Sequence, residues 1–465
     1  MRKLLFTISL VMFFYTFPKA QGEYNICYFN NAGIDFNGGN PSVLTNSQMG
    51  STEASASMFS SNGELLFYSN GGHRPGSPSH VGAVWNANHQ IMENGILGDS
   101  NGCASSFDGA VAFPKLPNGF SFNNAAPIGN STYYIFMRDC VESLYTSPYF
   151  NSGLTYCEID MDANNGLGKV VSKGNTVVPF DPGYGGSTNH EPLAALSNKN
   201  EDGWFVFSYN LDSLYSIEVN DSGIGNFKTH VAGSSRIIFS PSKEHVLVGN
   251  NLYKYDVSNN ELLFISTISE KFCAFSPNGK LLYGFDSDQL VQFNLTALDI
   301  LASRITIGPT FSANRLFLAP DARIYLTQMG GYYLLGAINC PNSIGVNCDL
   351  TMDSLYLGGN QFGYALTNIP ANYLYYNGAD CNLSVKENNS LSSDFDVYPN
   401  PSNGTFTIKM NNFTEPKPLQ VVSLEGKVVY SGELSNSKSE IDLSFIDAGV
   451  YIVEVMGVRK RLVLR

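Results

Sequence analysis

Ala274-Phe275-Ser276-Pro277-Asn278-Gly279-Lys280-Leu281-Leu282-Tyr283 is the stretch of this chain that decides its fold. Two apolar runs flank a Ser-Pro-Asn-Gly turn, which is the pattern of two strands joined by a tight turn. Related segments occur at residues 58–68, 238–248 and 317–326. Pro277 lies 36 residues after Pro241 and 43 residues before Pro320. Strand pairs that recur at a period of about 40 residues predict the blades of a β-propeller.

The number of blades follows from the first strand of each repeat. Such strands are expected near residues 57, 110, 193, 236, 272 and 315. Two further apolar segments, 26–36 and 363–376, are expected to pair and to close the ring as a shared blade. A blade cannot bury both faces alone, so blades stack around an axis. The sequence therefore predicts an all-β propeller of seven blades, with six as the alternative.

Composition agrees with this fold and narrows the range of partners. Charged residues make up 14% of the chain and aromatic residues 13%, and there are 44 glycines. Tyr, Phe and Gly in short runs favour strands joined by tight turns. The formal net charge is −13. Because an acidic surface repels phosphate backbones, we expect no nucleic acid partner.

The first residues have the pattern of a secretory signal peptide. Arg2 and Lys3 precede an uncharged apolar stretch over residues 4–17, and Ala20-Gln21-Gly22 offers a small-x-small cleavage site. The apolar stretch is shorter than the roughly 20 residues that span a bilayer. We therefore expect residues 1–22 to be a signal peptide rather than a membrane anchor.

The last seventy or so residues alternate short apolar runs with polar turns and end on a basic segment, 458–465. They carry a set of motif residues in this order: Tyr398, Pro399, Asn400, Pro401, Gly404, Gly426, Lys427, Gly449, Tyr451 and Lys460. With these residues the segment resembles the C-terminal sorting domain of proteins exported by bacterial type IX secretion. The number and spacing of its strands predict an immunoglobulin-like sandwich.

The resemblance implies an export route rather than an activity. It implies the type IX secretion machinery as a partner, passage through the periplasm and across the outer membrane, and an extracellular or cell-surface location. In that family the tail is removed after export, and the cargo is often attached to surface lipopolysaccharide. The same fate is the expectation here.

Four segments are expected along the chain. They are a signal peptide (1–22), a β-propeller (23–379), a polar Ser- and Asn-rich linker (380–393) and the sorting domain (394–465). The propeller also resembles a family of secreted bacterial WD-like or YVTN-like propellers of unassigned activity. Asn30-Asn31-Ala32-Gly33-Ile34-Asp35-Phe36 and Leu335-Gly336-Ala337-Ile338-Asn339 are among the matching residues. That family has no agreed catalytic motif, so the resemblance implies no catalytic residue.

Export permits disulfides among the eight cysteines. Cys340 and Cys348 flank a polar, turn-rich loop and form the favoured disulfide. Two other pairs, Cys103 with Cys140 and Cys27 with Cys381, are alternatives. Cys157 and Cys273 lie in apolar strand runs and are expected as buried thiols.

Candidate chemistry is sparse, and we predict no catalytic residue and no metal ligand. Residues 98–102 match Gly-x-Ser-x-Gly, but a strand rather than the helix of a nucleophile elbow follows. Residues 160–166 begin like a calcium loop but have Asn165 where Gly is needed, so a turn is favoured over a structural calcium ion. The six histidines form no His-x-His or His-Glu-x-x-His motif.

Two classes of function remain. The first is a secreted, surface-located binding or scaffold propeller with a glycan or peptide ligand. The second is a secreted hydrolase or lyase that acts on polysaccharide or peptide at the centre of the ring. Clustered carboxylates at the axis favour the second class, because glycosidases need two facing carboxylates. The lack of a compact catalytic motif favours the first.

Deletion of residues 394–465 should leave the folded propeller in the periplasm without changing its melting temperature, because the tail is an address and not part of the propeller core. Cell fractionation and thermal unfolding measure both effects. The sorting prediction fails if the truncated protein still reaches the medium or the cell surface.

Overall fold

The computed structural model describes residues 22–37, 40–50, 53–73, 81–98, 101–116, 131–140, 152–179, 191–210, 213–232, 236–310, 313–328, 334–357, 367–376, 395–410, 413, 416–423, 428–455 and 458–465. The chain divides into two compact units, residues 1–382 and 383–465. Among the described residues, no helix has the length and apolar character needed to cross a bilayer. The predicted linker, and the predicted signal peptide up to residue 21, lie outside the described residues.

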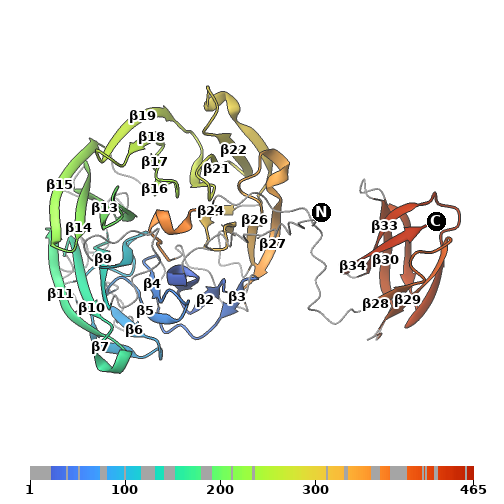
Figure 1. Ribbon diagram of the computed structural model, residues 1–465, viewed down its shortest axis with the longest axis horizontal. Coiled ribbons are helices and arrows are strands. Elements are labelled where there is room, and N and C mark those ends of the chain that lie inside the picture. Colours follow the sequence, from blue (N-terminus) through green and yellow to red (C-terminus); the bar gives the residue numbers. More distant parts are fainter. Residues whose placement is uncertain are drawn as a thin grey trace, which may run out of the picture. The chain divides into compact units, whose positions relative to one another are not determined.

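The first unit is a β-propeller of seven antiparallel meanders arranged around an axis (Figure 1). The blades, given in chain order, are β1 (Ile26–Phe29), β2 (Ala32–Asp35) and β3 (Ser42–Leu44); β4 (Ala56–Phe59), β5 (Leu65–Ser69), β6 (Ala83–Asn86) and β7 (Ile91–Ile96); β8 (Ala110–Pro114), β9 (Thr132–Arg138), β10 (Leu154–Asp160) and β11 (Lys169–Val178); β12 (Ala194–Ser197), β13 (Gly203–Asn210), β14 (Ser213–Asn220) and β15 (Gly223–Ala232); β16 (Ile237–Phe239), β17 (His245–Val248), β18 (Asn251–Asp256) and β19 (Glu261–Thr267); β20 (Lys271–Phe275), β21 (Leu281–Asp286), β22 (Gln289–Asn294) and β23 (Ile305–Pro309); β24 (Ala313–Leu318), β25 (Ile324–Gln328), β26 (Leu334–Ile338) and β27 (Leu350–Tyr356). The second and third blades join along their outer strands β7 and β11. This arrangement confirms the predicted all-β propeller of seven blades.

The repeated turns have the conformation that their sequence requires. In the turn between β20 and β21, the N–H of Gly279 donates to the carbonyl of Ser276 at 2.9 Å, and the N–H of Leu281 donates to the Ser276 hydroxyl at 2.9 Å. Gly279 has φ +72°, in the left-handed region that glycine enters without steric cost. Lys243 and Ala322 occupy the corresponding place in two other blades, with φ +61° and +65°. The turn geometry is therefore shared even where the glycine is replaced.

Buried aromatic side chains connect separate parts of the ring through both their rings and their polar atoms. Trp204, on β13, donates its indole N–H to the carbonyl of Pro114 at the end of β8 (2.8 Å) and packs on Phe113. Tyr24, in the short helix η1 (Gly22–Tyr24), donates its hydroxyl to the carbonyl of Ala112 at 2.7 Å. Large rings supply the apolar area that stabilises the ring of blades, and their polar tips find partners when buried.

The described residues do not show the predicted closure of the ring. The first blade takes all three of its described strands from the N-terminal side, the described residues 367–376 contain no strand, and residues 363–366 of the predicted closing segment lie outside the described residues. Residues 367–376 contain the short helix η9 (Ala371–Leu374), which lies in the middle of the ring (Figure 1). Pro370 precedes the helix and has no N–H for a sheet ladder. Residues 367–376 thus cross the axis, and we call them the axial plug.

The remaining short helices lie in loops between strands. They are η4 (Asn164–Gly166), η7 (Leu301–Ser303) and η8 (Gly345–Cys348).

The second unit is a β-sandwich of two sheets. One sheet orders as β28-β29-β32 and the other as β31-β30-β33-β34. The strands are β28 (Phe395–Tyr398), β29 (Thr405–Met410), β30 (Lys417–Ser423), β31 (Val428–Leu434), β32 (Lys438–Asp442), β33 (Gly449–Val455) and β34 (Val458–Leu464). Alternating buried positions along β29 and β33 face a shared core, as a half-buried strand requires. The immunoglobulin-like sandwich predicted for the tail agrees with these two sheets.

Replacing Tyr373 in the axial plug by Ala should destabilise the propeller by about 3 kcal/mol or more, because it empties a packed aromatic site. Tyr373 is 7% exposed and its ring lies 5.8 Å from that of Trp204 and 4.5 Å from that of Tyr24. Urea unfolding followed by tryptophan fluorescence reports on the propeller alone, since both tryptophans, Trp85 and Trp204, lie in it.

The matched control is Tyr375→Ala, two residues along the same plug, where the ring is 46% exposed. This change should alter the unfolding free energy by no more than about 0.5 kcal/mol. Equal effects of the two substitutions would show that the plug does not support the ring.

Candidate functional site

Three charged side chains meet at one end of the propeller axis. Asp108 lies just before β8, Arg236 just before β16, and Arg315 within β24. Each of these strands is the innermost of its blade, so residues at their starts gather around the axis. We call this end of the axis the axial mouth.

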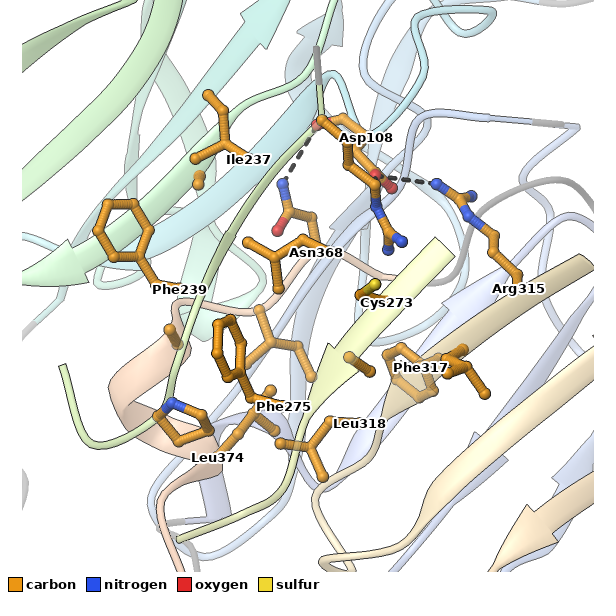
Figure 2. Close-up of a pocket in the computed structure, with 18 of the residues that line it drawn as sticks. Asp108, Ile237, Phe239, Cys273, Phe275, Arg315, Phe317, Leu318, Asn368 and Leu374 are labelled. Atoms are coloured by element: carbon orange, nitrogen blue, oxygen red, sulfur yellow. Dashed lines mark hydrogen bonds and ion pairs between the residues drawn. The ribbon is translucent and has the colours of Figure 1, made fainter. Parts of the chain in front are cut away.

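The Asp108 carboxylate contacts both guanidinium groups, and Figure 2 shows it beside Arg315. Its Oδ2 accepts from Nη2 of Arg315 at 2.9 Å and from Nε of Arg236 at 3.3 Å. Arg315 also lies over the ring of Phe107, with its guanidinium carbon 3.8 Å from the ring centroid. Two cations share one carboxylate in this cluster.

Burial shapes the electrostatics of the cluster. The side chain of Arg315 is 7% exposed and that of Arg236 is 25% exposed. Burial lowers the pKa of Arg315 to about 10, while the Asp108 charge opposes this shift. Arg315 therefore stays charged at neutral pH. The Nη1 atom of Arg236 is buried and has no hydrogen-bond partner among the described residues, and a donor left in this way costs about 1–3 kcal/mol.

The axial plug closes the axis behind this cluster. Asn368 donates its side-chain N–H groups to the carbonyls of Asp108 (3.2 Å) and Leu193 (2.9 Å). Its backbone N–H donates to the carbonyl of Ser55 at 3.2 Å. One residue thus bonds to segments that lead into three inner strands, β4, β8 and β12. These hydrogen bonds fix the position of the axial plug relative to the segments that lead into the three inner strands.

A cavity of about 130 Å³ lies between the cluster and the plug. Its polar rim is formed by Asp108, Arg236, Arg315 and Asn368 (Figure 2). Its remaining walls are largely apolar and include Ile237, Phe239, Phe275, Phe317, Leu318 and Leu374. Ligand sites for small molecules are usually about 300–1,000 Å³. This cavity is therefore large enough only for a small group of a ligand that lies mainly at the mouth.

The loop that carries Phe107 and Asp108 is fixed from several sides. A disulfide joins Cys103 to Cys140, with the Cα atoms 5.5 Å apart. The N–H of Cys103 donates to the carbonyl of Arg138 at 2.9 Å, and the N–H of Phe107 donates to the carboxylate of Glu191 at 2.8 Å. The loop is thereby held to β9 and to the segment before β12. Such fixation keeps the ion pairs at the mouth in place.

Asp139 lies beside this disulfide and is almost fully buried. Burial raises the pKa of Asp139 to about 6. Two contacts oppose this shift: Nε of Arg138 lies 3.3 Å from the carboxylate, and the N–H of Gly153 donates to it at 2.9 Å. The carboxylate therefore titrates just below neutral pH rather than near pH 4.

The cysteine predictions are partly wrong. The pair Cys103–Cys140, an alternative in the sequence analysis, is confirmed. The favoured pair is not formed, because Cys348 is a free thiol and Cys340 forms its disulfide elsewhere. Cys348 packs in the core between the last two blades. The N–H of Cys340 donates to the carbonyl of Cys348 at 2.9 Å, so a backbone hydrogen bond closes the loop between these two cysteines.

Three further cysteines are free and buried. Cys157 and Cys273 are buried thiols as predicted. Cys27 is also free, so its proposed pairing with Cys381 is wrong.

The other sequence candidates are described only in part. Asp99 and Ser100 of the Gly-x-Ser-x-Gly match lie outside the described residues, and the described residues after them lead into strand β8. The calcium-like loop is the turn between β10 and β11, in which Asp160 accepts the N–H of Asp162 at 2.9 Å. Within the described ranges, no three His, Cys, Asp or Glu side chains gather as a metal site.

The sorting-motif residues from the two ends of the tail come together. The Asn400 side chain donates to the carbonyl of Arg461 at 2.6 Å and accepts the N–H of Val463 at 2.9 Å. Lys460 forms an ion pair with Asp396 at 3.0 Å. The Asn400 amide thus serves strand β34 as a neighbouring strand would.

Three other motif residues have structural roles, and two are not described. A Cβ on Gly404 would lie 2.6 Å from the backbone of Ser444, so no larger residue fits there. Tyr451, on β33, donates its hydroxyl to the carbonyl of Asp447 at 2.8 Å, and Gly449 begins that strand. Gly426 and Lys427 lie outside the described residues.

The charged residues of the axial mouth were missed in the sequence analysis. A signal for them was present, because Asp108, Arg236 and Arg315 each lie at or beside a predicted first strand. First strands are largely apolar, so a charge at or beside the start of one is a signal for a group near the axis, although Lys271 at the start of β20 is exposed.

Comparison with solved structures gives distant likenesses. The periplasmic gluconolactonase of Pseudomonas aeruginosa is 11% identical with a TM-score of 0.43, over 75% of this chain and 97% of that one. The propeller domain of Cps50 (Swd1) from Myceliophteria thermophila is 10% identical with a TM-score of 0.38, over 66% and 94%. The Dos1 propeller is 14% identical with a TM-score of 0.37, over 64% and 71%.

Replacing Asp139 by Asn should flatten the pH dependence of stability. The folded-state pKa of about 6 exceeds the unfolded value of 3.8. The stabilisation from this group is thus fully present below pH 3.8 and is lost as the pH rises through 6. Between pH 4 and 7, the unfolding free energy of the wild type should fall by about 2–3 kcal/mol relative to Asp139→Asn.

Urea unfolding at several pH values measures this difference. Asp221→Asn, an exposed aspartate in the turn between β14 and β15, is the control and should run parallel to the wild type. A parallel profile for Asp139→Asn as well would contradict the raised pKa.

Sequence comparison identifies the tail. No curated protein matches this chain. Residues 396–464 match the family described as "Secretion system C-terminal sorting domain". The chain is thus a β-propeller that carries a type IX secretion sorting domain at its C-terminal end, and this domain implies export across the outer membrane.

Proposed function

We propose that this chain is a secreted, surface-located binding protein that presents the axial mouth of its propeller to a glycan or peptide ligand. The observation that carries the proposal is the state of the carboxylates at the mouth. Asp108 is held by two guanidinium groups, and Glu191 accepts the N–H of Phe107. Glu53, whose charge also acts on Arg315, accepts from the Ser105 hydroxyl at 3.3 Å. Each of these three carboxylates thus has a structural partner.

This pairing favours binding over hydrolysis. Hydrolases that use carboxylates need two of them facing the substrate, with one group changing its protonation during the reaction. Oδ2 of Asp108 is occupied by contacts to both guanidinium groups. Asp108 therefore serves to fix Arg236 and Arg315 in position.

The mouth offers recognition groups on a rigid frame. The guanidinium groups and the ring of Phe107 are fixed by the ring of blades, by the axial plug and by the Cys103–Cys140 disulfide. A preorganised site loses little conformational entropy when a ligand binds. The sorting domain supplies the route to the surface, and attachment to lipopolysaccharide after removal of the tail is part of the same proposal.

The test combines retention with product release. The full chain is applied to glycan and peptide arrays, and bound ligands are then analysed by mass spectrometry for cleavage. We expect retention without cleavage products. Asp108→Asn should weaken retention at least tenfold, because it leaves two neighbouring guanidinium groups without their shared counter-charge.

Asp321→Asn is the control, since Asp321 is a largely buried carboxylate outside the mouth that accepts from Tyr325 at 2.7 Å. It should leave retention unchanged. Cleavage products that disappear in Asp108→Asn would instead assign a hydrolase or lyase to the mouth and overturn the proposal.

A further inference from the structure

A second cavity adjoins the axial mouth and shares Arg236 and Phe107 with it. It lies between the blade β16–β19 and the blade β20–β23 and has a volume of about 360 Å³. Arg236 lines both cavities. We call this cavity the lateral pocket, and its volume is in the range of small-molecule sites.

Phe272, which forms part of the wall of the lateral pocket, has an unusual backbone conformation. Phe272 has φ +52°, in the left-handed region that bulky residues rarely enter, and the pairing of β20 with β21 shifts register between Lys271 and Ala274. The ring of Phe272 is 43% exposed as a result. Strained residues of this kind concentrate at binding and catalytic sites, where the surrounding structure maintains them.

The pocket is cationic. Arg236 lines it with a side chain that is 25% exposed and paired with Asp108 at 3.3 Å, and Lys271 is exposed. Glu270 also lines the pocket, but its carboxylate accepts from Nε of Arg304 at 2.8 Å. The exposed part of the Arg236 side chain and Lys271 are the cations that an anionic group at this wall would meet.

The rest of the lining is apolar. Phe107 and Phe272 contribute rings, and Pro192, Ile238 and Leu247 contribute aliphatic surface. Apolar walls with few polar groups suit a ligand with an apolar body, while a guanidinium group matches the planar, two-oxygen geometry of a carboxylate. A sugar ring, with hydroxyls on most of its carbons, would leave many of them without partners against such walls.

We propose that the lateral pocket binds a carboxylate carried on an apolar or aromatic body, with Arg236 and Lys271 at the carboxylate and Phe272 against the body. The inference rests on the proposed function as a binding protein and names the chemistry of one of its ligands. The carboxylate can belong to a small organic acid or to the C-terminus of a peptide with an apolar last residue.

Calorimetric titration of the full chain tests the inference. Phenylacetate is the acid probe and phenylacetamide its neutral counterpart of the same shape. We expect phenylacetate to bind at least tenfold more tightly than phenylacetamide. N-acetylphenylalanine compared with phenylacetate then distinguishes the sources: tighter binding of the former indicates a peptide C-terminus, and equal or weaker binding indicates a small acid.

Four variants localise the binding. Arg236→Gln should weaken phenylacetate at least tenfold, and Phe272→Ala at least threefold. Arg323→Gln, which removes an arginine from a hairpin outside the pocket, and Phe264→Ala, which removes an exposed ring on β19, should have no effect. If Arg236→Gln does not fold, Arg236→Lys keeps the charge and loses the two-donor geometry, and it should still weaken binding.

Equal binding of phenylacetate and phenylacetamide, tighter binding of phenyl phosphate than of phenylacetate, or no binding of phenylacetate at about 10 mM would each overturn the inference. Those results leave the proposed function standing if the array ligands are still retained without cleavage. Cleavage of array ligands removes the proposed function whatever phenylacetate does, so the two failures are distinguishable.

Discussion

The structure depends on how the axial plug bonds to the innermost strands of the ring. The inner strand of each blade has one edge without a neighbouring strand, and its backbone groups need partners when they are buried. Asn368 supplies partners to segments at three blades, and Thr367 donates to the carbonyl of Tyr28 in the first blade at 2.8 Å. The axial plug thus supplies hydrogen-bond partners to the inner strands at the centre of the ring.

The same closure sets up the axial mouth. Asn368 bonds to the backbone of Asp108, and the side chain of Asp108 in turn holds Arg236 and Arg315. The disulfide at Cys103 fixes the loop from the other side. Charged side chains on a rigid frame of this kind move little when a ligand binds. The mouth and the lateral pocket beside it are therefore suited to recognition.

Three predictions depended on contacts that local patterns do not report. Residues 367–376, predicted as part of a closing strand, contain helix η9 after Pro370, which cannot donate to a sheet ladder. Cys340 and Cys348 are joined by a backbone hydrogen bond, but Cys348 is a free thiol in the core. Cys27, at the other end of the propeller sequence, is also a free buried thiol.

The blades, their first strands and the sorting domain could be predicted from residue order alone, because apolar alternation, turn residues and short motifs act over fewer than ten residues. It placed charged residues such as Asp108 and Arg236 at or beside those strands without showing that they meet. The fold is needed to show that Arg236 and Arg315 share the carboxylate of Asp108 and that Cys103 pairs with Cys140. It is also needed to show that the axial plug lies at the centre of the ring. These features depend on strands that are far apart in the sequence and meet around one axis. The spacing of residues along the chain does not show which of them will meet there.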